Sequence, residues 1–167
     1  METLIQQIIN GFSLGSVYAL IAVGYSLVYS ILLFSNFAHG GFLVIGGYIC
    51  YYTLAAVGNN IWVASLLAFL GAGVSAVLVE RGAYKPIRER TNVTLYLLIA
   101  SMGMSIVIEN IFVVTVGGRF RALPPVIPMT PVSVFGLATT SAFDILSLVM
   151  AMIFLAGLQV FLSTTKW

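Results

Sequence analysis

The chain has 167 residues, of which 60% are hydrophobic and 7% are charged, against roughly 25% charged residues in soluble domains. So few charged side chains cannot cover an apolar core with a solvated surface, and the hydrophobicity is far too high for intrinsic disorder. The composition therefore excludes a water-soluble globular protein and a disordered chain, and it predicts a protein surrounded by membrane lipid.

The spacing of the charged residues predicts how many helices cross the membrane. No Asp, Glu, Lys or Arg occurs between Glu2 and Glu80. A hydrocarbon core of about 30 Å takes about 20 residues of helix, so this run holds at most three crossings. Two further apolar stretches follow it. The sequence therefore predicts an all-α, polytopic integral membrane protein with about five transmembrane helices, at residues 11–34, 42–57, 61–79, 93–115 and 145–162.

The first expected span is interpreted as a true membrane helix rather than a signal peptide, because no basic residue precedes it and no small-residue cleavage site accompanies it. The first and third spans each carry a stripe of small residues, which lets another helix backbone approach closely within a membrane. These positions are expected to pack against neighbouring helices: Gly11, Gly15 and Ala19 in the first span, and Ala68, Ala72 and Ala76 in the third.

A polar break near residues 35–41, with the sequence Ser-Asn-Phe-Ala-His-Gly-Gly, separates the first two spans. It is either a tight turn or an unwound segment. Transporters often interrupt helices where backbone groups line a substrate path, since irregular backbone facing lipid would lack hydrogen-bond partners. Asn36, His39 and Gly40 are therefore candidates for a solute path. For His39 the favoured interpretation is structural, as a buried side chain that fixes the geometry of the break, with a place along the solute path as the alternative.

Charged residues gather between residues 80 and 90, and we expect this stretch to be a solvated loop broken by Pro86. Two membrane crossings separate the stretch at 80–90 from the C-terminal tail, so the stretch and the tail lie on the same side of the membrane. Together they hold more basic residues than the connection at 116–141, which lies on the other side. Positive residues favour the cytoplasmic side, so the loop and the C-terminus are expected there and the N-terminus outside. The basic residues of this loop are Arg81, Lys85, Arg88 and Arg90.

Glu109 is the single charged residue within the fourth expected span. A charge at the bilayer centre costs about 2.5–3.5 kcal/mol on insertion scales. It therefore needs a protein or water partner, and the sequence leaves open whether Glu109 and Asn110 serve structural pairing or a solute path. Ser101 and Ser105 are interpreted as helix-to-helix hydrogen-bonding residues.

The last connection and span carry two local signals. Residues 116–141 are too long and too proline-rich for a simple turn, so they are expected to form an extended cap on one membrane face. The sequence Ser141-Ala142-Phe143-Asp144 then fits a capping box, which predicts that Asp144 caps the fifth helix.

The residues give no support for enzyme chemistry. One His and one Cys cannot form a conventional metal site, and no phosphate-binding glycine loop is present. A basic surface for nucleic acid is also missing. We therefore expect no catalytic residue, no metal and no cofactor, and any energy for transport must come from separate subunits.

Several ordered motifs resemble the permease subunits of bacterial branched-chain amino acid ABC transporters. They are Asn-Gly-Phe-Ser-Leu-Gly-Ser-Val-Tyr-Ala-Leu at 10–20, Asn-Phe-Ala-His-Gly at 36–40, Glu-Arg at 80–81, Tyr-Lys-Pro-Ile-Arg at 84–88, and Gly-Met-Ser through Glu-Asn at 103–110. The resemblance covers essentially the whole chain. It implies an inner-membrane subunit that pairs with a second homologous permease, two cytoplasmic ATP-binding subunits and a periplasmic substrate-binding protein.

The resemblance also sets expectations about extent and substrate. Family members are usually nearly twice as long, so residues 1–167 are expected to be the N-terminal part of one permease domain, unable to couple ATP to transport alone. Branched-chain amino acids are the leading substrate, with urea or short amides as an alternative. A different class is also left open, in which the chain is a structural membrane component or an ATP-independent oligomeric channel.

Overall fold

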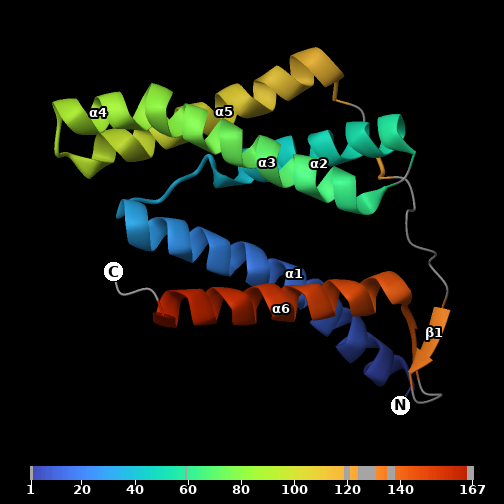
Figure 1. The fold of residues 1–167 in the computed structure, drawn as a ribbon. Coiled ribbons are helices and arrows are strands. Elements are labelled where there is room, and N and C mark those ends of the chain that lie inside the picture. Colours follow the sequence, from blue (N-terminus) through green and yellow to red (C-terminus); the bar gives the residue numbers. More distant parts are fainter. Residues whose placement is uncertain (1, 59, 119–120, 124–130, 135–137, 165–167) are drawn as a thin grey trace. The chain divides into compact units, whose positions relative to one another are not determined.

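The computed structural model describes residues 2–58, 60–118, 121–123, 131–134 and 138–164 (Figure 1). The elements follow in chain order: helices α1 (Glu2–Leu32), α2 (His39–Val57) and α3 (Ile61–Val79), the π-helical turn η1 (Glu80–Tyr84), helices α4 (Lys85–Arg90) and α5 (Thr94–Val116), strands β1 (Pro131–Val134) and β2 (Ala138–Ser141), and helix α6 (Ala142–Thr164).

Five helical segments in the described part of the chain are long and apolar enough to cross a membrane: Thr3–Leu32, His39–Val57, Ile61–Arg90, Thr94–Val116 and Asp144–Thr164. This confirms the predicted all-α, polytopic architecture with five spans. Within the last connection, β1 and β2 form a small antiparallel hairpin in which Pro131 lies opposite Ser141.

The helix ends differ from the predicted bounds at the first break. Helix α1 begins at Glu2 and ends at Leu32, and α2 begins at His39 rather than at residue 42. The non-helical break therefore covers residues 33–38, and His39, Gly40 and Gly41 lie in the first turn of α2. Glycine lowers helix propensity in isolation, but neighbouring segments override it here. Helix α3 has the bounds predicted for the third span, although the helical segment continues to Arg90, and α5 and α6 differ from the predicted fourth and fifth spans by only a few residues.

The chain divides into two compact units, residues 28–126 and residues 1–27 with 127–167. In the second of these, the side chain of Ser13 on α1 donates a hydrogen bond to Asp144 Oδ1 at 3.2 Å. The backbone N–H of Ser141 donates to Asp144 Oδ2 at 3.3 Å. This contact is the reciprocal bond of a capping box, and it confirms that Asp144 caps α6.

In the unit of residues 28–126, α2 and α3 form a close helical hairpin. Helix α2 ends at Gly58, whose φ of 76° lies in the left-handed region that glycine adopts without strain. Asn60 then caps α3 by accepting a hydrogen bond from the Val63 N–H at 3.3 Å. Farther along, a side chain at Gly46 would place its Cβ 3.7 Å from Ala72 Cβ, so the two helices approach closely there.

The charge-dense stretch at residues 80–90 is helical, and the prediction of a solvated loop is wrong. Helix α3 continues through η1 into α4. Pro86 lies in the first turn of α4, where its missing N–H costs little. In η1 the Lys85 N–H donates to the carbonyl of Glu80, one residue farther back than in an α-helix. This wider turn carries the helix past the proline.

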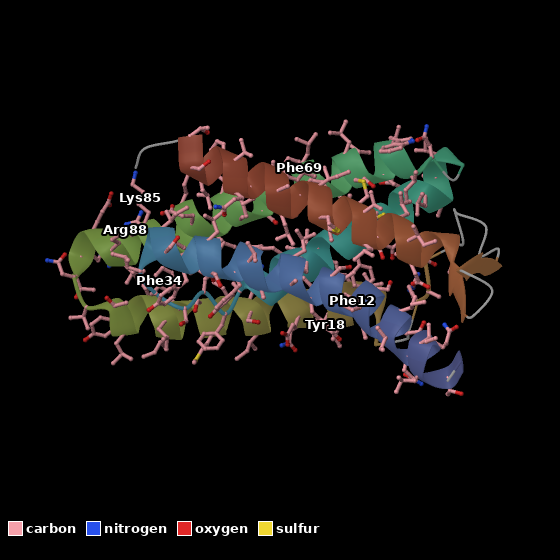
Figure 2. All side chains as sticks on the ribbon, turned by 90° about the horizontal axis from the view of Figure 1, so that it is seen from below. Phe12, Tyr18, Phe34, Phe69, Lys85 and Arg88 are labelled. Carbon is pink, nitrogen blue, oxygen red and sulfur yellow. The ribbon has the colours of Figure 1, made fainter. Side chains whose placement is uncertain are left out.

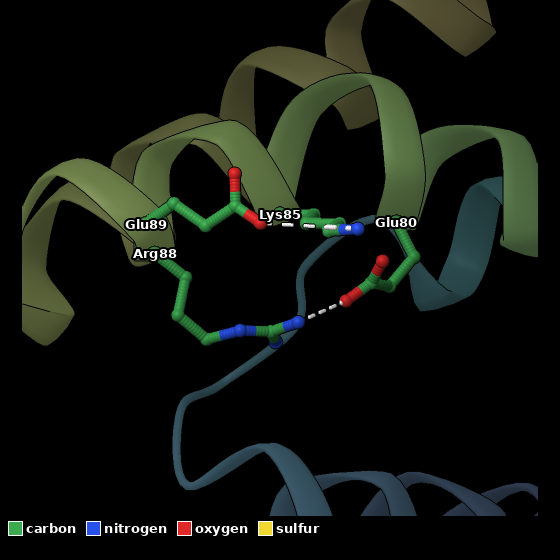
Figure 3. Close-up of polar contacts among 4 residues, drawn as sticks. All are labelled: Glu80, Lys85, Arg88 and Glu89. Atoms are coloured by element: carbon green, nitrogen blue, oxygen red, sulfur yellow. Dashed lines mark hydrogen bonds and ion pairs between the residues drawn. The ribbon is translucent and has the colours of Figure 1, made fainter.

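Two ion pairs span the turns of this extension (Figure 3). Arg88 Nη2 lies 2.5 Å from Glu80 Oε1, and Lys85 Nζ lies 3.8 Å from Glu89 Oε1. All four side chains are substantially exposed, so each pair stabilises the helix by at most about 1 kcal/mol. Figure 2 shows Lys85 and Arg88 at the charged end of this helix.

The three long helices of residues 28–126 leave most of their apolar surface uncovered. Within the most apolar stretch of each segment, only 17% is buried in α2, 6% in the segment that begins with α3, and 17% in α5. Aromatic side chains stand out from the helices, among them Phe69 (Figure 2), and Trp62 is 77% exposed. Contiguous apolar surface of this extent requires lipid or further protein around it.

Candidate functional site

The break between α1 and α2 begins with a strained residue. Leu33 has φ = 58°, the one positive φ at a non-glycine residue in the described part of the chain. This conformation costs a leucine about 1 kcal/mol or more. The N–H of Leu33 donates to the carbonyl of Tyr29 at 2.8 Å, which closes the last turn of α1. The chain then leaves the helix and runs through residues 34–38.

Asn36 organises the break from within. Its side chain is only 5% exposed, and Oδ1 accepts hydrogen bonds from the Ala38 N–H at 3.1 Å and from Tyr84 Oη at 2.8 Å. The His39 N–H donates to the Asn36 carbonyl at 3.2 Å. The side chain thus forms a local turn that leads into α2 and ties that turn to η1.

Ser101 on α5 completes the hydrogen bonding of the break. Its hydroxyl is fully buried, accepts from the Phe37 N–H at 3.2 Å and lies 3.2 Å from the Ser35 carbonyl. It also lies 2.8 Å from the Leu98 carbonyl in its own helix. A single side chain therefore serves backbone groups that lipid could not satisfy. The predicted helix-to-helix hydrogen bonds are wrong in partner, because Ser101 serves the break and its own helix, and Ser105 bonds to Glu109 within α5.

Apolar side chains enclose this hydrogen-bonded joint. The rings of Phe34 and Tyr84 meet edge to face with centroids 5.5 Å apart, and both side chains are buried. Val79 and Leu97 belong to the same buried cluster. Phe34, Asn36, Tyr84 and Ser101 are named the break joint below. Tyr84 could have been identified by its place in the Tyr-Lys-Pro-Ile-Arg motif, but only the fold brings it to Asn36.

The other break candidates lie at the start of α2. His39 is partly buried and Gly40 is exposed, whereas the backbone of Gly41 is buried against α5. A Cβ at Gly41 would lie 3.0 Å from Ile108 Cδ1, so a side chain there would require the Ile108 side chain to shift. Gly41 therefore lies in close contact with Ile108 of α5.

A second polar feature lies farther along the same two helices. Val44 and Tyr48 of α2 and Glu109, Phe112 and Val113 of α5 line an open cavity of about 410 Å³. Gly117 and Gly118 complete its lining. This space is named the Glu109 cavity below.

An aromatic stack forms one wall of the Glu109 cavity. The rings of Tyr48 and Phe112 lie nearly parallel, with centroids 4.6 Å apart. Along α2, Tyr51 and Tyr52 extend the aromatic surface. Arg121 places its guanidinium 5.6 Å from the Tyr51 ring centroid, a cation–π arrangement. The sequence interpretation did not select these residues, although Tyr48 and Tyr52 lie one helical turn apart.

Glu109 and Asn110 do not pair with each other. Glu109 Oε1 accepts a hydrogen bond from the Ser105 hydroxyl at 3.2 Å, one turn back on α5. Asn110 Nδ2 donates to the Ile106 carbonyl at 2.8 Å, also within its own helix. Both side chains are exposed, and no Lys or Arg in the described part of the chain lies within ion-pair distance of Glu109.

The small-residue stripes have different surroundings. Ala72 faces Gly46 of α2, and the Ala68 carbonyl also lies close to that glycine. In the first helix, Gly11, Gly15 and Ala19 line an open apolar groove together with Leu148 and Met152 of α6. Ala76 is partly buried. Among the described residues no cluster of three His, Cys, Asp or Glu side chains could hold a metal ion.

Comparisons with known proteins identify related sequences. The family described as branched-chain amino acid transport system, permease component, matches residues 7–167. The high-affinity branched-chain amino acid transport system permease proteins LivH of Salmonella typhimurium and of Escherichia coli K12 are each 41% identical over 128 residues. The corresponding protein BraD of Pseudomonas aeruginosa is 34% identical over 175 residues.

These matches cover most of the chain but only part of each relative. The two LivH matches cover 72% of the chain and 41% of the relative's length. The BraD match covers 97% of the chain and 56% of the relative's length. No solved structure matches the chain.

Proposed function

Because the chain belongs to the family of permease components of branched-chain amino acid transport systems, we propose that it forms part of the membrane path of an ATP-driven importer of branched-chain amino acids. It is a multi-pass membrane protein with five apolar spans. Its role in the importer is to provide the path, whereas ATP hydrolysis takes place on separate subunits.

The observation that carries this proposal is the satisfied break between α1 and α2. A membrane protein that served only as an anchor would have no need for a helix interruption held by Asn36 and Ser101 from two different segments. Transporters place irregular backbone where it lines or supports a cavity. The break joint fixes the start of α2, whose first turn contains His39 and Gly40. These two residues are proposed to lie beside the path.

The partners of this importer follow from the same proposal. The permease pairs with a second homologous permease, two cytoplasmic ATP-binding subunits and a periplasmic protein that delivers the substrate. Exposed apolar surface on α3 supports further protein or lipid contact, since that helix buries little of its apolar stretch within the chain. ATP binding drives the permease pair between outward and inward access because nucleotide binds the two states with different affinity.

The proposed orientation in a bacterial inner membrane places the helical extension at residues 80–90 in the cytoplasm. Its four basic side chains are all exposed or paired at the surface of the helix. Positive residues favour that side, so the N-terminus lies outside. A reporter enzyme that is active only in the periplasm should be inactive when fused after Arg90, and activity of that fusion would overturn this orientation.

Transport is tested with the complete system in a bacterial strain that lacks its own branched-chain amino acid importers. Wild-type cells should accumulate radiolabelled leucine, and a variant of the ATP-binding subunit that cannot hydrolyse ATP should abolish the accumulation. Uptake of urea or acetamide in place of leucine would support the alternative substrate class. Flux that persists with the inactive ATP-binding subunit would instead support a channel and overturn the proposal.

A further inference from the structure

The starting observation is a carboxylate within an apolar span that has no basic partner among the described residues. Glu109 lies seven residues before the end of α5, which corresponds to about 10 Å along the helix axis. Its hydrogen-bond partner is the neutral hydroxyl of Ser105. A carboxylate at that depth is retained where a cation or water compensates its charge. Glu109 can therefore take water or a positive group from outside the described part of this chain as its partner.

The cavity beside Glu109 has the size and lining of a site for a small solute. Its volume is about 410 Å³, which lies within the usual range of about 300–1,000 Å³ for ligand sites. Val44 and Val113 provide aliphatic walls, and the Tyr48–Phe112 stack provides a flat aromatic wall. An aliphatic side chain would be in contact with apolar atoms, while its charged end could reach Glu109.

A positive group lies at the same end of α5. The Arg121 guanidinium donates a hydrogen bond to the carbonyl of Val116 at 3.4 Å, directly before the two glycines that line the cavity. Gly117 adopts φ = 85°, which L side chains adopt only with strain, and it ends α5 at the cavity. The cavity is therefore lined by a carboxylate and apolar walls, and Arg121, which is not itself a lining residue, lies beside its glycine end.

We propose that the Glu109 cavity is a transient binding site for the imported amino acid within the membrane path. The ammonium group of the zwitterion binds the Glu109 carboxylate, its carboxylate binds Arg121, and its aliphatic side chain packs on Tyr48 and Phe112. This assignment rests on the proposed importer function and adds to it a site, a binding orientation and a reason for the unpaired charge. A basic side chain of a partner permease is the competing counter-ion for Glu109.

The first test measures leucine uptake by the complete transporter with Glu109→Gln, which keeps size and hydrogen bonding but removes the charge. Loss of a hydrogen bond between the ammonium group and a charged carboxylate weakens binding, so uptake by Glu109→Gln at low leucine concentration should fall about tenfold or more. Glu89→Gln is the matched control, since Glu89 is exposed and pairs only with Lys85. It should change uptake less than twofold.

Two further measurements separate ligand binding from a structural role. Ser105→Ala removes the hydrogen bond to Glu109, and it should reduce uptake less than about threefold. A loss of uptake equal to that of Glu109→Gln would mean that uptake depends on the hydrogen bond between Ser105 and Glu109 rather than on the free charge of Glu109. That result would overturn the site. Recovery of the assembled complex is measured in parallel, and its loss with Glu109→Gln would assign Glu109 to a subunit contact and also overturn it.

Direct occupancy is tested by cysteine labelling. Val113→Cys is introduced into the complete transporter with Cys50→Ser, which removes the natural thiol. Saturating leucine should slow maleimide labelling of the introduced cysteine severalfold, and isoamylamine, which has the ammonium and the apolar chain without the carboxylate, should protect less. Unchanged labelling with active wild-type uptake would refute this site and leave the importer function intact. Absence of any amino acid uptake by the wild type would instead refute the proposed function.

Discussion

Removing the Asn36 side chain tests whether the break joint is held by one buried acceptor. In Asn36→Ala, the hydroxyl of Tyr84 and the N–H of Ala38 both lose their partner in a buried environment. An unsatisfied buried group costs about 1–3 kcal/mol, so the variant should lose about 2–6 kcal/mol of stability. Tyr84→Phe removes the donor instead and leaves Asn36 bonded to Ala38, which should cost only about 1 kcal/mol.

The double variant gives the sharpest result. Once Asn36 is absent, the Tyr84 hydroxyl is itself the orphaned group, so adding Tyr84→Phe should stabilise the Asn36→Ala protein rather than weaken it further. Melting temperatures of the three variants and the wild type, measured by size-exclusion recovery of the detergent-purified protein after heating, give the comparison. Additive losses in the double variant would refute the hydrogen-bond reasoning, as would an Asn36→Ala protein as stable as the wild type.

Three further outcomes follow from individual contacts and use the same heating assay. Ser101→Ala leaves the Phe37 N–H without an acceptor and should cost about 1–3 kcal/mol; unchanged stability would exclude that bond. Asp144→Ala removes the cap of α6 and should cost about 0.5–2 kcal/mol, whereas a neutral result would contradict the capping box. Glu80→Gln breaks an exposed pair with Arg88 and should lower stability by less than about 1 kcal/mol at low salt, with the difference vanishing at high salt.

The number and place of the membrane spans could be predicted from the sequence because the bilayer imposes a length. A charge-free run from residue 3 to residue 79 can be buried in lipid only as a small number of helices of about 20 residues. The cap at Asp144 was also predictable, since a capping box is a local interaction between residues three positions apart. These features depend on the solvent and on neighbours in the chain, and both can be derived from the order of the residues.

Other features depend on residues far apart in the chain. Asn36 could be recognised as a polar residue in a break, but its partner Tyr84 lies 48 positions away in the chain. Ser101 lies 66 positions from Ser35 and 64 from Phe37, the two residues of the break to which it bonds. The stretch at residues 80–90 looked like a loop because it is charged and contains Pro86, yet a π-helical turn carries the helix through it. Local propensity did not indicate that turn.

The amino-acid order alone determined that the chain lies in a membrane, how many times it crosses and where its polar interruptions fall, because the cost of charge in hydrocarbon depends only on composition along the chain. Tertiary structure decided which backbone groups of the break are satisfied and that Glu109 lines a cavity with Tyr48 and Phe112. Hydrogen bonds and cavities need atoms brought together from separate helices, and only packing sets those distances.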